Sequence, residues 1–588
     1  MTEPVEAEAE AVEALIARVR AWADDDPQPS TARHLRELTH LVEDGTPGEV
    51  ARATAELREL FRDGLAFGTA GLRGEVGPGP NRMNVAVVRR AAAGVAAWVR
   101  ASGSTEGGVI VGRDARHGSE AFVAETVEVL TGIGLDVHIL GGPVPTPVLA
   151  FAVRRHRAAA GIMVTASHNP GRDNGYKVYD REGRQIDSDQ AAEIATAMAG
   201  AGRVTDLPSG GAGNPKVHPV GLDLVDEYVS AIADDVLVRR HDRATVQVAH
   251  TSLHGVGGPV VRQACRHVGF VTLHEVPEQS EADPDFPTVA FPNPEEPGAL
   301  DRLRTLAAYV SADVALANDP DADRLAMAVW DPALGDQREA SSWRKLTGDE
   351  LGWLLADHLI RRGGFPPHGI LATTIVSSTL LRALAAEAGV GYAETLTGFK
   401  WIVRASTPEH PLILGYEEAL GYCIGDQVRD KDGISALLVA AEMVSDLVEH
   451  GLTVLDRLDD LARRFGVHAT GQWSLRLEGA DGAARIAAAM ARLRAAPPAT
   501  IGHRVVAGVS DLADGAPGRG LPPADVVGLA LHGARVVVRP SGTEPKLKGY
   551  VEVVEPVDEG GDLAAARVTA AAGLSALIAA LPAALGLA

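Results

Sequence analysis

Three segments of this 588-residue chain share one pattern of apolar and polar positions. In each segment a short, continuous apolar run leads into a polar turn, and apolar residues at helical spacing follow the turn. The apolar runs cover 108–112, 245–249 and 370–374, and the helical segments end near 130, 268 and 388. A run of this kind before an amphipathic helix is typical of a buried strand in a parallel sheet. The pattern therefore predicts an α/β fold with three successive α/β domains, whose sheets are mixed but mainly parallel.

The last part of the chain has a different pattern. Apolar and polar positions alternate in 472–477 and 534–539, and helical segments cover 483–495 and 563–581. Alternation over a few residues is typical of a strand with one buried face, so we expect a smaller C-terminal α+β domain with an antiparallel sheet. The predicted domains are 1–242, which includes an N-terminal helical extension, 243–342, 343–464 and 465–588.

Neither end of the chain has the pattern of a targeting signal. Residues 1–24 mix Glu with Ala, Val and Leu, which predicts an acidic amphipathic helix and not a basic signal segment. Residues 571–588 form the only long apolar stretch, and they contain Gly573, Ser575 and Pro582. This composition favours a buried last helix with a loose tail over a membrane span.

The balance of acidic and basic residues argues against some classes of function. The chain has 78 acidic and 55 basic residues and a net charge of −23, which disfavours nonspecific binding to nucleic acid or to an anionic membrane. Its two cysteines, Cys265 and Cys423, provide neither a disulfide framework nor a thiolate metal site. We therefore expect a cytoplasmic protein without nucleic-acid or membrane partners, in which any metal site uses oxygen ligands.

A serine follows one of the predicted strands. The apolar run 160–164 leads into Thr165-Ala166-Ser167-His168-Asn169-Pro170, which places Ser167 at the carboxyl end of a strand, where α/β folds bind their ligands. His168 beside it is a residue that handles protons near neutral pH. A Ser-His-Asn-Pro string alone is as often an ordinary turn, so its meaning depends on what lies near it.

Three carboxylates follow another predicted strand. Asp319, Asp321 and Asp323 come directly after the apolar run 314–317. Alternate residues of an extended loop point the same way, so the three side chains converge, and their mutual repulsion calls for a cation. An EF-hand is excluded, because its Gly and Glu positions hold Arg324 and Trp330. Oxygen ligands of this kind suit Mg²⁺.

Three further motifs contain residue types that suit phosphate or sugar binding. They are Arg539-Pro540-Ser541-Gly542-Thr543, which can hold a phosphate with a guanidinium, hydroxyls and backbone amides; Gly415-Tyr416-Glu417-Glu418 with the later Lys431; and the glycine-rich turn 67–74, which contains Arg73. Each motif is weak evidence alone.

In their order along the chain, the five motifs resemble those of the α-D-phosphohexomutase superfamily, which includes the phosphoglucomutases and phosphomannomutases. The resemblance covers about 65–554, and the strings 68–74, 174–179, 397–401 and 415–418 resemble the longer phosphoglucomutase and phosphopentomutase branch. It implies three α/β domains and a C-terminal α+β domain around a central cleft.

The resemblance also implies roles for individual residues. Ser167 matches the phosphoserine and, with Asp319, Asp321 and Asp323, the Mg²⁺ ligands. Lys177 matches a general acid/base, and His168, Arg73 and Arg324 match residues that assist transfer. The residues that match substrate-binding positions are Thr397, Gly398, Lys400, Glu417, Lys431, Arg539, Ser541, Gly542 and Thr543.

The implied reaction is a Mg²⁺-dependent interconversion of sugar 1-phosphate and sugar 6-phosphate through a sugar 1,6-bisphosphate, which also primes the enzyme. A monomer or small homo-oligomer is expected to act on glucose phosphates, with mannose or pentose phosphates as alternatives. Many members have Glu-x-Ser in the sugar loop where this chain has Glu417-Glu418-Ala419, which leaves the preferred sugar open.

Two other functions compete with this interpretation. A strand followed by Asp-x-Asp also begins the haloacid dehalogenase-type phosphatases, which would make Asp319 the nucleophile and would leave Ser167 without a role. A catalytically silent sugar-phosphate-binding protein could have the same scaffold, but decayed enzymes usually lose the nucleophile or a metal ligand, and this chain has both.

Overall fold

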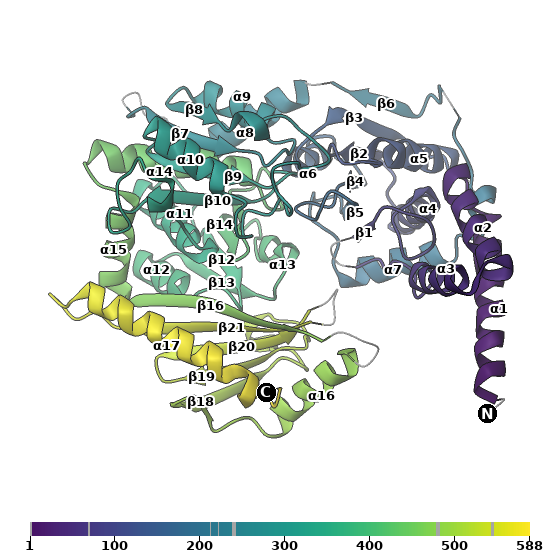
Figure 1. The fold of residues 1–588 in the computed structure, drawn as a ribbon. Coiled ribbons are helices and arrows are strands. Elements are labelled where there is room, and N and C mark those ends of the chain that lie inside the picture. Colours follow the sequence, from purple (N-terminus) through teal and green to yellow (C-terminus); the bar gives the residue numbers. More distant parts are fainter. Residues whose placement is uncertain are drawn as a thin grey trace.

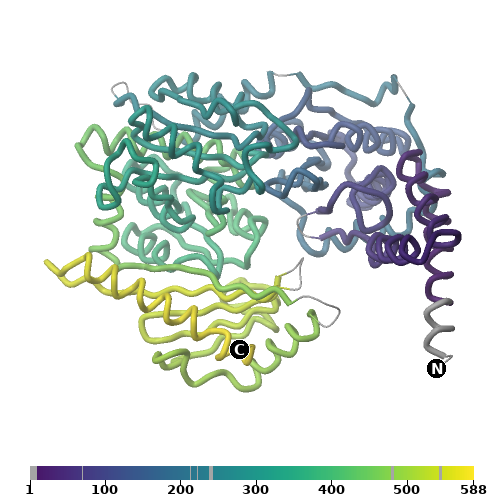
Figure 2. Tube along the Cα trace, in the orientation of Figure 1, coloured from purple at the N-terminus to yellow at the C-terminus, as the bar shows by residue number. Residues whose placement is uncertain are grey.

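The computed structural model has four domains, each built around one sheet (Figure 1). It describes residues 3–68, 71–211, 213–221, 223–237, 243–477, 482–541 and 546–587. The trace in Figure 2 runs from the first domain to the second beside it, continues into the third, and ends in the fourth, which lies beneath the third in this view. The three α/β domains and the C-terminal α+β domain expected from the sequence are present.

The first domain has a six-stranded sheet with the order β1-β5-β4-β2-β3-β6. Its strands are β1 (Leu72–Glu75), β2 (Val109–Arg113), β3 (Val137–Pro143), β4 (Ala160–Val164), β5 (Asp173–Tyr179) and β6 (Val217–Val220), and its helices are α4 (Val85–Ala101), α5 (Ser119–Gly132), α6 (Thr146–Arg155) and α7 (Ser188–Ala199). The run from β4 through β2 and β3 to β6 is parallel, whereas β5 and β1 are antiparallel. Every residue of β4 is buried, as its continuous apolar run predicts.

Three helices precede this domain: α1 (Glu3–Ala23), α2 (Pro29–Asp44) and α3 (Pro47–Leu60). They form a small core of their own, in which Val19, Leu35 and Leu57 are almost fully buried. Asp25 attaches the extension to the first domain, because it accepts hydrogen bonds from the amide of Val204 and from Arg90. The extension is therefore packed on the domain and is not a free tail.

The second domain has a five-stranded sheet with the order β11-β10-β9-β7-β8. Its strands are β7 (Val246–Thr251), β8 (Val271–Glu275), β9 (Val314–Asn318), β10 (Leu325–Trp330) and β11 (Trp343–Lys345), and its helices are α9 (Gly258–Val268) and α10 (Asp301–Val310). Helix α8 (Asp223–Val236) lies against α9 and α6. Strands β9 and β10 form a hairpin whose turn, 319–324, contains the three aspartates.

The third domain has a four-stranded sheet with the order β13-β12-β14-β15. Its strands are β12 (Ile370–Thr374), β13 (Gly391–Thr395), β14 (Leu412–Glu417) and β15 (Gly421–Ile424), and its helices are α11 (Gly348–Arg362), α12 (Leu380–Ala388), α13 (Phe399–Arg404), α14 (Gly433–Glu449) and α15 (Val454–Phe465). Helix α14 is buried along most of its length and contacts β7, β9 and β10 of the second domain. A single hydrophobic core thus joins the second and third domains and includes α6 of the first.

The fourth domain has an antiparallel sheet with the order β16-β21-β20-β19-β18-β17. Its strands are β16 (Val467–Arg476), β17 (Thr500–Ile501), β18 (Arg504–Asp511), β19 (Val527–Leu531), β20 (Ala534–Pro540) and β21 (Lys546–Glu555), and its helices are α16 (Gly482–Ala495) and α17 (Leu563–Ala584). One face of the sheet packs against α16 and α17, and part of the other face meets the third domain.

The last helix differs from the sequence prediction. Helix α17 continues through Pro582, and it buries only one face, formed by Leu563, Ala570, Gly573, Leu577 and Leu581. By length and composition it is the one helix of the described residues that could cross a membrane, and 22% of its apolar window is buried. The expectation of a buried helix failed because an Ala-rich stretch has the same composition on its buried and its exposed faces.

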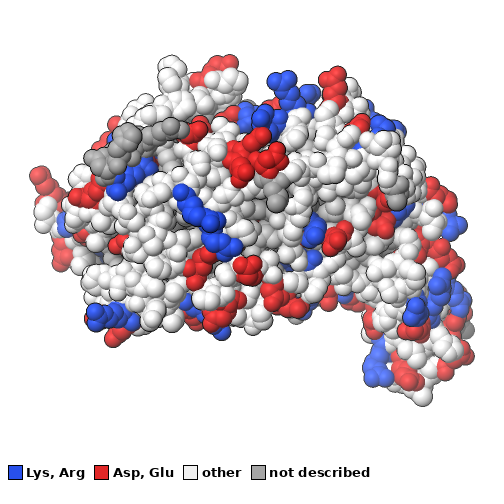
Figure 3. All heavy atoms as spheres, turned by 90° about the horizontal axis from the view of Figure 1, so that it is seen from above, with Lys and Arg blue, Asp and Glu red and all other residues white. Residues whose placement is uncertain are grey.

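Acidic and basic side chains are interspersed on the face of the molecule that Figure 3 shows.

Candidate active site

The loop after β4 presents Ser167 to the second domain. The Ser167 hydroxyl donates a hydrogen bond of 3.0 Å to Oδ2 of Asp319, although 152 residues separate the two in the chain. Ser167 has a left-handed φ of 54°, which is costly for a residue other than glycine and is typical of functional sites. Its amide donates to Oγ1 of Thr165 at 2.9 Å, which helps to fix this conformation. The serine of the first domain and the acidic turn of the second therefore form one site.

The three aspartates converge as the sequence predicts. One carboxylate oxygen from each of Asp319, Asp321 and Asp323 lies within 4.8 Å of the others, and all three residues are fully buried. Burial, together with the charges of Asp321 and Asp323, raises the pKa of Asp319 well above its ordinary value. Burial alone would also raise the pKa of Asp321, but the adjacent Lys177 ammonium holds it below its ordinary value.

Two lysines neutralise this cluster in the structure. Lys177, on β5, donates to Asp321 at 2.6 Å and to Asp323 at 2.9 Å. Lys431 lies 3.2 Å from Asp323, so a residue expected at the sugar also faces the acidic turn. Burial alone would lower the pKa of Lys177, but the charges of Asp321 and Asp323 raise it, and the side chain is an ammonium at neutral pH.

The aspartates also fit a divalent cation. Oδ1 of Asp321 and Oδ1 of Asp323 are buried without a hydrogen-bond partner, a costly arrangement in a protein interior. Unpartnered carboxylate oxygens beside a serine hydroxyl form the hard-oxygen donor set that Mg²⁺ prefers. The turn is therefore a candidate site for a divalent metal, and Lys177 is hydrogen-bonded to two of its three carboxylates.

Cationic and proton-handling groups surround the serine. The backbone amide of Arg324 donates to Asp319 at 3.0 Å, and its guanidinium donates to the carbonyl of Ala419 in the sugar loop at 2.9 Å. The ring of His168 lies 3.3 Å from the Ser167 hydroxyl, and burial and the charges of Arg324 and Arg73 lower the pKa of His168 well below its ordinary value. His168 is therefore neutral at pH 7. Burial lowers the pKa of Arg73, on β1, and the charges of Asp321 and Asp323 oppose the shift.

The third domain adds Glu417, at the end of β14. Burial raises the pKa of Glu417 to about 7, although Lys431 and Arg324 oppose the shift. Thr397 and Gly398 lie in the loop before α13, and the hydroxyl of Thr397 is buried without a partner. Lys400 follows on α13, and burial and Arg404 lower its pKa to about 8.

The fourth domain contributes a basic hairpin. Arg539 on β20 pairs with Lys548 on β21, and the amide of Ser541 donates to the carbonyl of Lys546 at 2.7 Å. Burial, Lys546 and Arg539 lower the pKa of Lys548, whereas the charges of Glu418 and Glu295 oppose the shift. Gly542 and Thr543 lie outside the described residues.

Two residues of the site were not predicted from the sequence. Thr146, at the start of α6, donates through its hydroxyl to Oδ2 of Asp321 at 2.7 Å. Arg116 donates to four carbonyl oxygens of the serine loop, those of Ser167, Asn169, Pro170 and Asp173, at 2.5–3.0 Å. The only sequence signal for Arg116 is its place in the polar turn after β2, and Thr146 has none beyond the prolines on either side.

Comparison with known proteins identifies the family. The four domain profiles of the phosphoglucomutase/phosphomannomutase family match residues 64–203, 226–331, 347–465 and 476–570: the three alpha/beta/alpha domains I, II and III and the C-terminal domain. The chain belongs to the phosphoglucomutase/phosphomannomutase family. It is therefore an isomerase of the phosphohexomutase type.

Named members of the family cover most of the chain. A Haemophilus influenzae protein named "Probable phosphomannomutase" is 37% identical over 477 residues, which are 80% of this chain and 93% of the relative. A Staphylococcus epidermidis phosphoglucomutase is 33% identical over 518 residues, or 85% and 93% of the two chains.

Solved structures share the fold. A Burkholderia thailandensis phosphoglucomutase/phosphomannomutase family protein has a TM-score of 0.65 at 21% identity and covers 88% of this chain and 97% of its own. Parafusin, a Paramecium phosphoglucomutase, has a TM-score of 0.64 at 19% identity, with coverage of 88% and 95%. At these identities the likeness concerns the fold alone.

Proposed function

We propose that this protein interconverts α-D-glucose 1-phosphate and glucose 6-phosphate, with Ser167 as the group that donates and accepts the phosphoryl. The observation that supports this most directly is the 3.0 Å hydrogen bond from the Ser167 hydroxyl to Asp319. A phosphoryl group on that oxygen would lie beside the acidic turn. A Mg²⁺ ion held by Asp319, Asp321 and Asp323 would neutralise the phosphoryl oxygens and so make the phosphorus more electrophilic.

The reaction then has two balanced transfers. In the first, the phosphorus–oxygen bond to Ser167 breaks, a bond to the 6-hydroxyl of glucose 1-phosphate forms, and the product is glucose 1,6-bisphosphate. In the second, after the bisphosphate has reversed its orientation, its 1-phosphoryl returns to Ser167 and glucose 6-phosphate leaves. Each transfer moves one proton from the attacking hydroxyl to the departing oxygen.

Two residues are placed to move that proton. His168 is neutral and lies 3.3 Å from the Ser167 hydroxyl, so it can accept the serine proton in the second transfer, in which Ser167 is the attacking hydroxyl. Lys177 is charged and hydrogen-bonded to the acidic turn, so it acts first as a cation and as a proton donor to the departing oxygen. Arg73 and Arg324 supply further positive charge to the transferring group.

The remaining matched residues would hold the sugar and its second phosphate. Glu417 would accept hydrogen bonds from ring hydroxyls, assisted by Thr397, Gly398, Lys400 and Lys431 on the same domain. Arg539, Ser541, Gly542 and Thr543 would bind the phosphate that does not react. Since the intermediate must bind in two orientations, this loop has to accept either phosphate, which suits flexible basic groups and backbone donors.

The sugar loop leaves more than one sugar phosphate as a candidate substrate. Ala419 provides no hydroxyl to the sugar loop, and its carbonyl is occupied by Arg324. The relatives are named both phosphomannomutase and phosphoglucomutase, so mannose phosphates are the second candidate, and pentose phosphates are the third. We propose a cytoplasmic enzyme that acts as a monomer or small homo-oligomer and is primed by the sugar bisphosphate.

One comparative assay tests the proposal. The 1-phosphates of glucose, mannose, ribose and glucosamine would each be supplied with Mg²⁺ and a catalytic amount of the matching bisphosphate, and product formation would be measured. Mass spectrometry of the enzyme should find the phosphoryl group on Ser167. A phosphoryl group on Asp319, with release of inorganic phosphate, would instead indicate the aspartyl phosphatase. Absence of turnover with all four sugars would indicate a silent binding protein.

A further inference from the structure

A cavity of about 980 Å³ lies between the third and fourth domains. The third domain contributes β13 and α13 to its wall, and the fourth contributes β19, β20 and the loop 519–522. None of the residues expected at the serine, the acidic turn or the sugar loop lines this cavity. It is therefore separate from the candidate active site, and its size is that of a pocket for a small organic molecule.

One part of the wall is apolar and aromatic. Trp401 and Leu396 of the third domain meet Leu512, Leu521 and Val537 of the fourth in a small hydrophobic cluster that faces the cavity. An indole beside aliphatic side chains favours a flat apolar ring.

Another part of the wall has an excess of positive charge around Glu394, at the end of β13. Arg382 donates to Glu394 at 2.9 Å, and Arg519 donates to its second oxygen. The side chain of Glu394 is 8% exposed, whereas those of Arg382 and Arg519 are 53% and 48% exposed. A guanidinium has five N–H donors, and each of these two uses one on the shared carboxylate, so several donors remain directed to solvent or to a ligand.

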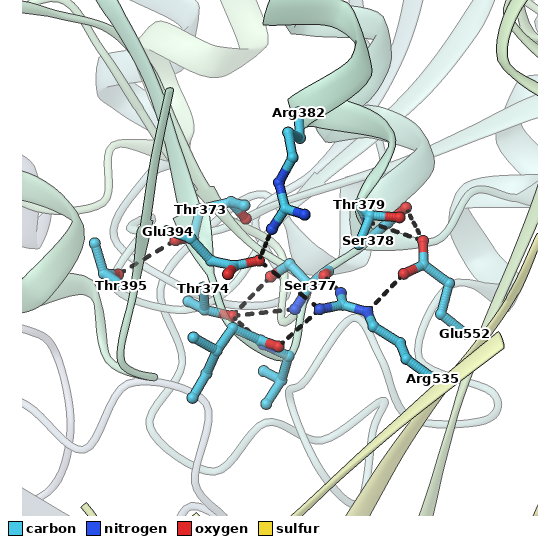
Figure 4. A network of polar contacts seen from close by, with 12 residues as sticks. Thr373, Thr374, Ser377, Ser378, Thr379, Arg382, Glu394, Thr395, Arg535 and Glu552 are labelled. Atoms are coloured by element: carbon cyan, nitrogen blue, oxygen red, sulfur yellow. Dashed lines mark hydrogen bonds and ion pairs between the residues drawn. The ribbon is translucent and has the colours of Figure 1, made fainter. Parts of the chain in front are cut away.

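In a third arginine of the same wall, Arg535, each of the three guanidinium nitrogens donates a hydrogen bond. Arg535 donates to Glu552 at 2.7 Å and to the carbonyl oxygens of Ile375 and Ser377. In Figure 4, Arg535 and Glu552 of the fourth domain contact the loop 377–379 of the third domain, and the guanidinium of Arg382 points toward Glu394. Arg404, which also lines the cavity, uses both terminal nitrogens of its guanidinium on Lys400 and on residues of the first domain. The arginines with most of their donors free are therefore Arg382 and Arg519, one from each domain.

We propose that this cavity binds a small organic anion with a flat ring and one phosphate or carboxylate group. The ring lies against Trp401 and the leucines, and the anionic group lies between Arg382 and Arg519. Because its contacts come from both domains, the ligand holds them at one relative angle. Trp401 is adjacent to Lys400, and Arg535 shares β20 with Arg539, so the ligand also influences both loops proposed to bind substrate. This effect on activity rests on the proposed function, whereas the binding does not.

Binding is tested first, without any activity measurement. Adenosine 5′-monophosphate and phenyl phosphate serve as ring-bearing anions and inorganic phosphate as the anion without a ring, with calorimetry on the full chain. We expect at least one ring-bearing anion to bind at least 10-fold more tightly than inorganic phosphate. The double variant Arg382→Ala/Arg519→Ala should weaken that binding at least 10-fold, and Arg302→Ala, a surface arginine of the second domain paired with Glu278, should leave it unchanged. Binding should quench tryptophan fluorescence in the wild type and not in Trp401→Phe.

Two results would overturn the proposal. One is that neither ring-bearing anion binds at millimolar concentration, or that binding is equal in the wild type and the double variant with unchanged thermal unfolding. The other is displacement of the anion by saturating glucose 6-phosphate, which would place it in the substrate site. If the anion binds as expected but no sugar phosphate is turned over, the proposed function fails and the cavity site stands.

Discussion

The hydroxyl of Ser167 and the carboxylate of Asp319 lie 3.0 Å apart, although they come from different domains. Each is at the end of a buried strand, β4 in the first domain and β9 in the second. Because both strand ends face the same junction, the serine hydroxyl of one sheet meets the acidic turn of the other. Any change in the angle between these domains would separate the two, so the packing of α6, α8 and α14 in one shared core is part of the site.

The first prediction concerns Ser167. Replacement by Ala removes the hydroxyl that we propose accepts the phosphoryl group, so turnover of glucose 1-phosphate should fall by at least about 10⁴-fold. A coupled assay for glucose 6-phosphate measures the loss, and binding of the substrate should persist. Ser575→Ala on the exposed face of α17 is the matched control and should have wild-type activity. Full turnover by Ser167→Ala would remove the serine from the mechanism.

The second prediction concerns the acidic turn. EDTA should abolish activity and Mg²⁺ should restore it. Asp323→Asn should raise the Mg²⁺ concentration for half-maximal activity by about 10–100-fold, because one charged ligand is lost. Asp331→Asn, which changes the residue directly after β10 and outside the cluster, should not change the Mg²⁺ titration. Activity that is independent of the metal would contradict the assignment of the three aspartates.

The strands of the α/β domains were predictable because a parallel sheet buries both faces of its strands. That requirement produces continuous apolar runs, and β2, β7, β9 and β12 lie where the runs predict them. The convergence of Asp319, Asp321 and Asp323 was predicted from alternation in an extended loop. The structure reaches it through a tight turn instead, in which the amide of Ala322 donates to the carbonyl of Asp319 at 2.9 Å and Ala322 has a left-handed φ of 55°. The family followed from the order of five motifs, and the four matching domain profiles confirm it.

Contacts between distant segments were not predictable. Arg116 belongs to a short turn and Thr146 begins helix α6, and their roles depend on carbonyls and carboxylates that lie far along the chain or on another domain. The exposed face of α17 was missed for a related reason, because a run of alanines does not show which face meets a sheet.

The third prediction concerns Arg116, which acts on the serine loop and does not touch a reacting atom. Its four hydrogen bonds to backbone carbonyls hold Ser167 in its left-handed conformation. Arg116→Ala should therefore lower kcat by about 10–100-fold with little change in the Mg²⁺ titration, and Arg116→Lys should recover part of the loss. Arg113→Ala, on the same strand end, is the control. An equal loss of kcat in Arg113→Ala would mean that the turn as a whole is responsible, and not the four hydrogen bonds of Arg116.

The fourth prediction concerns pH and Glu552. Burial alone would raise the pKa of Glu552, but the hydrogen bond from His468 and the charge of Arg535 lower it from an ordinary value of 4.5 to about 2. A lowered pKa in the folded state stabilises the protein above pH 4.5, and this contribution disappears as the pH falls towards 2. Glu552→Gln should therefore lower the free energy of unfolding by about 1–3 kcal/mol at pH 7, and the difference from the wild type should shrink below pH 4.5.

Denaturant unfolding at several pH values measures this difference. Glu555→Gln on the same strand is the control, and its unfolding free energy should follow that of the wild type. A difference between Glu552→Gln and the wild type that is the same at pH 3 and pH 7 would show that the loss comes from packing and not from the carboxylate charge.

The fifth prediction concerns Gly255, whose turn packs against Pro320 of the acidic turn. Gly255 lies so close to the backbone of Pro320 that a Cβ atom would be 2.3 Å from its carbonyl oxygen, and the adjacent amide of Val256 donates to that same oxygen at 2.8 Å. Gly255→Ala must therefore displace Pro320, which stands between Asp319 and Asp321. We expect a loss of about 1–3 kcal/mol in unfolding free energy and a decrease in kcat of about 10–100-fold. Gly64→Ala, where a Cβ atom would have no neighbour within 4 Å, should change neither. Wild-type kcat in a Gly255→Ala protein would mean that the acidic turn tolerates displacement, and the alignment of Ser167 with Asp319 would then not limit the rate.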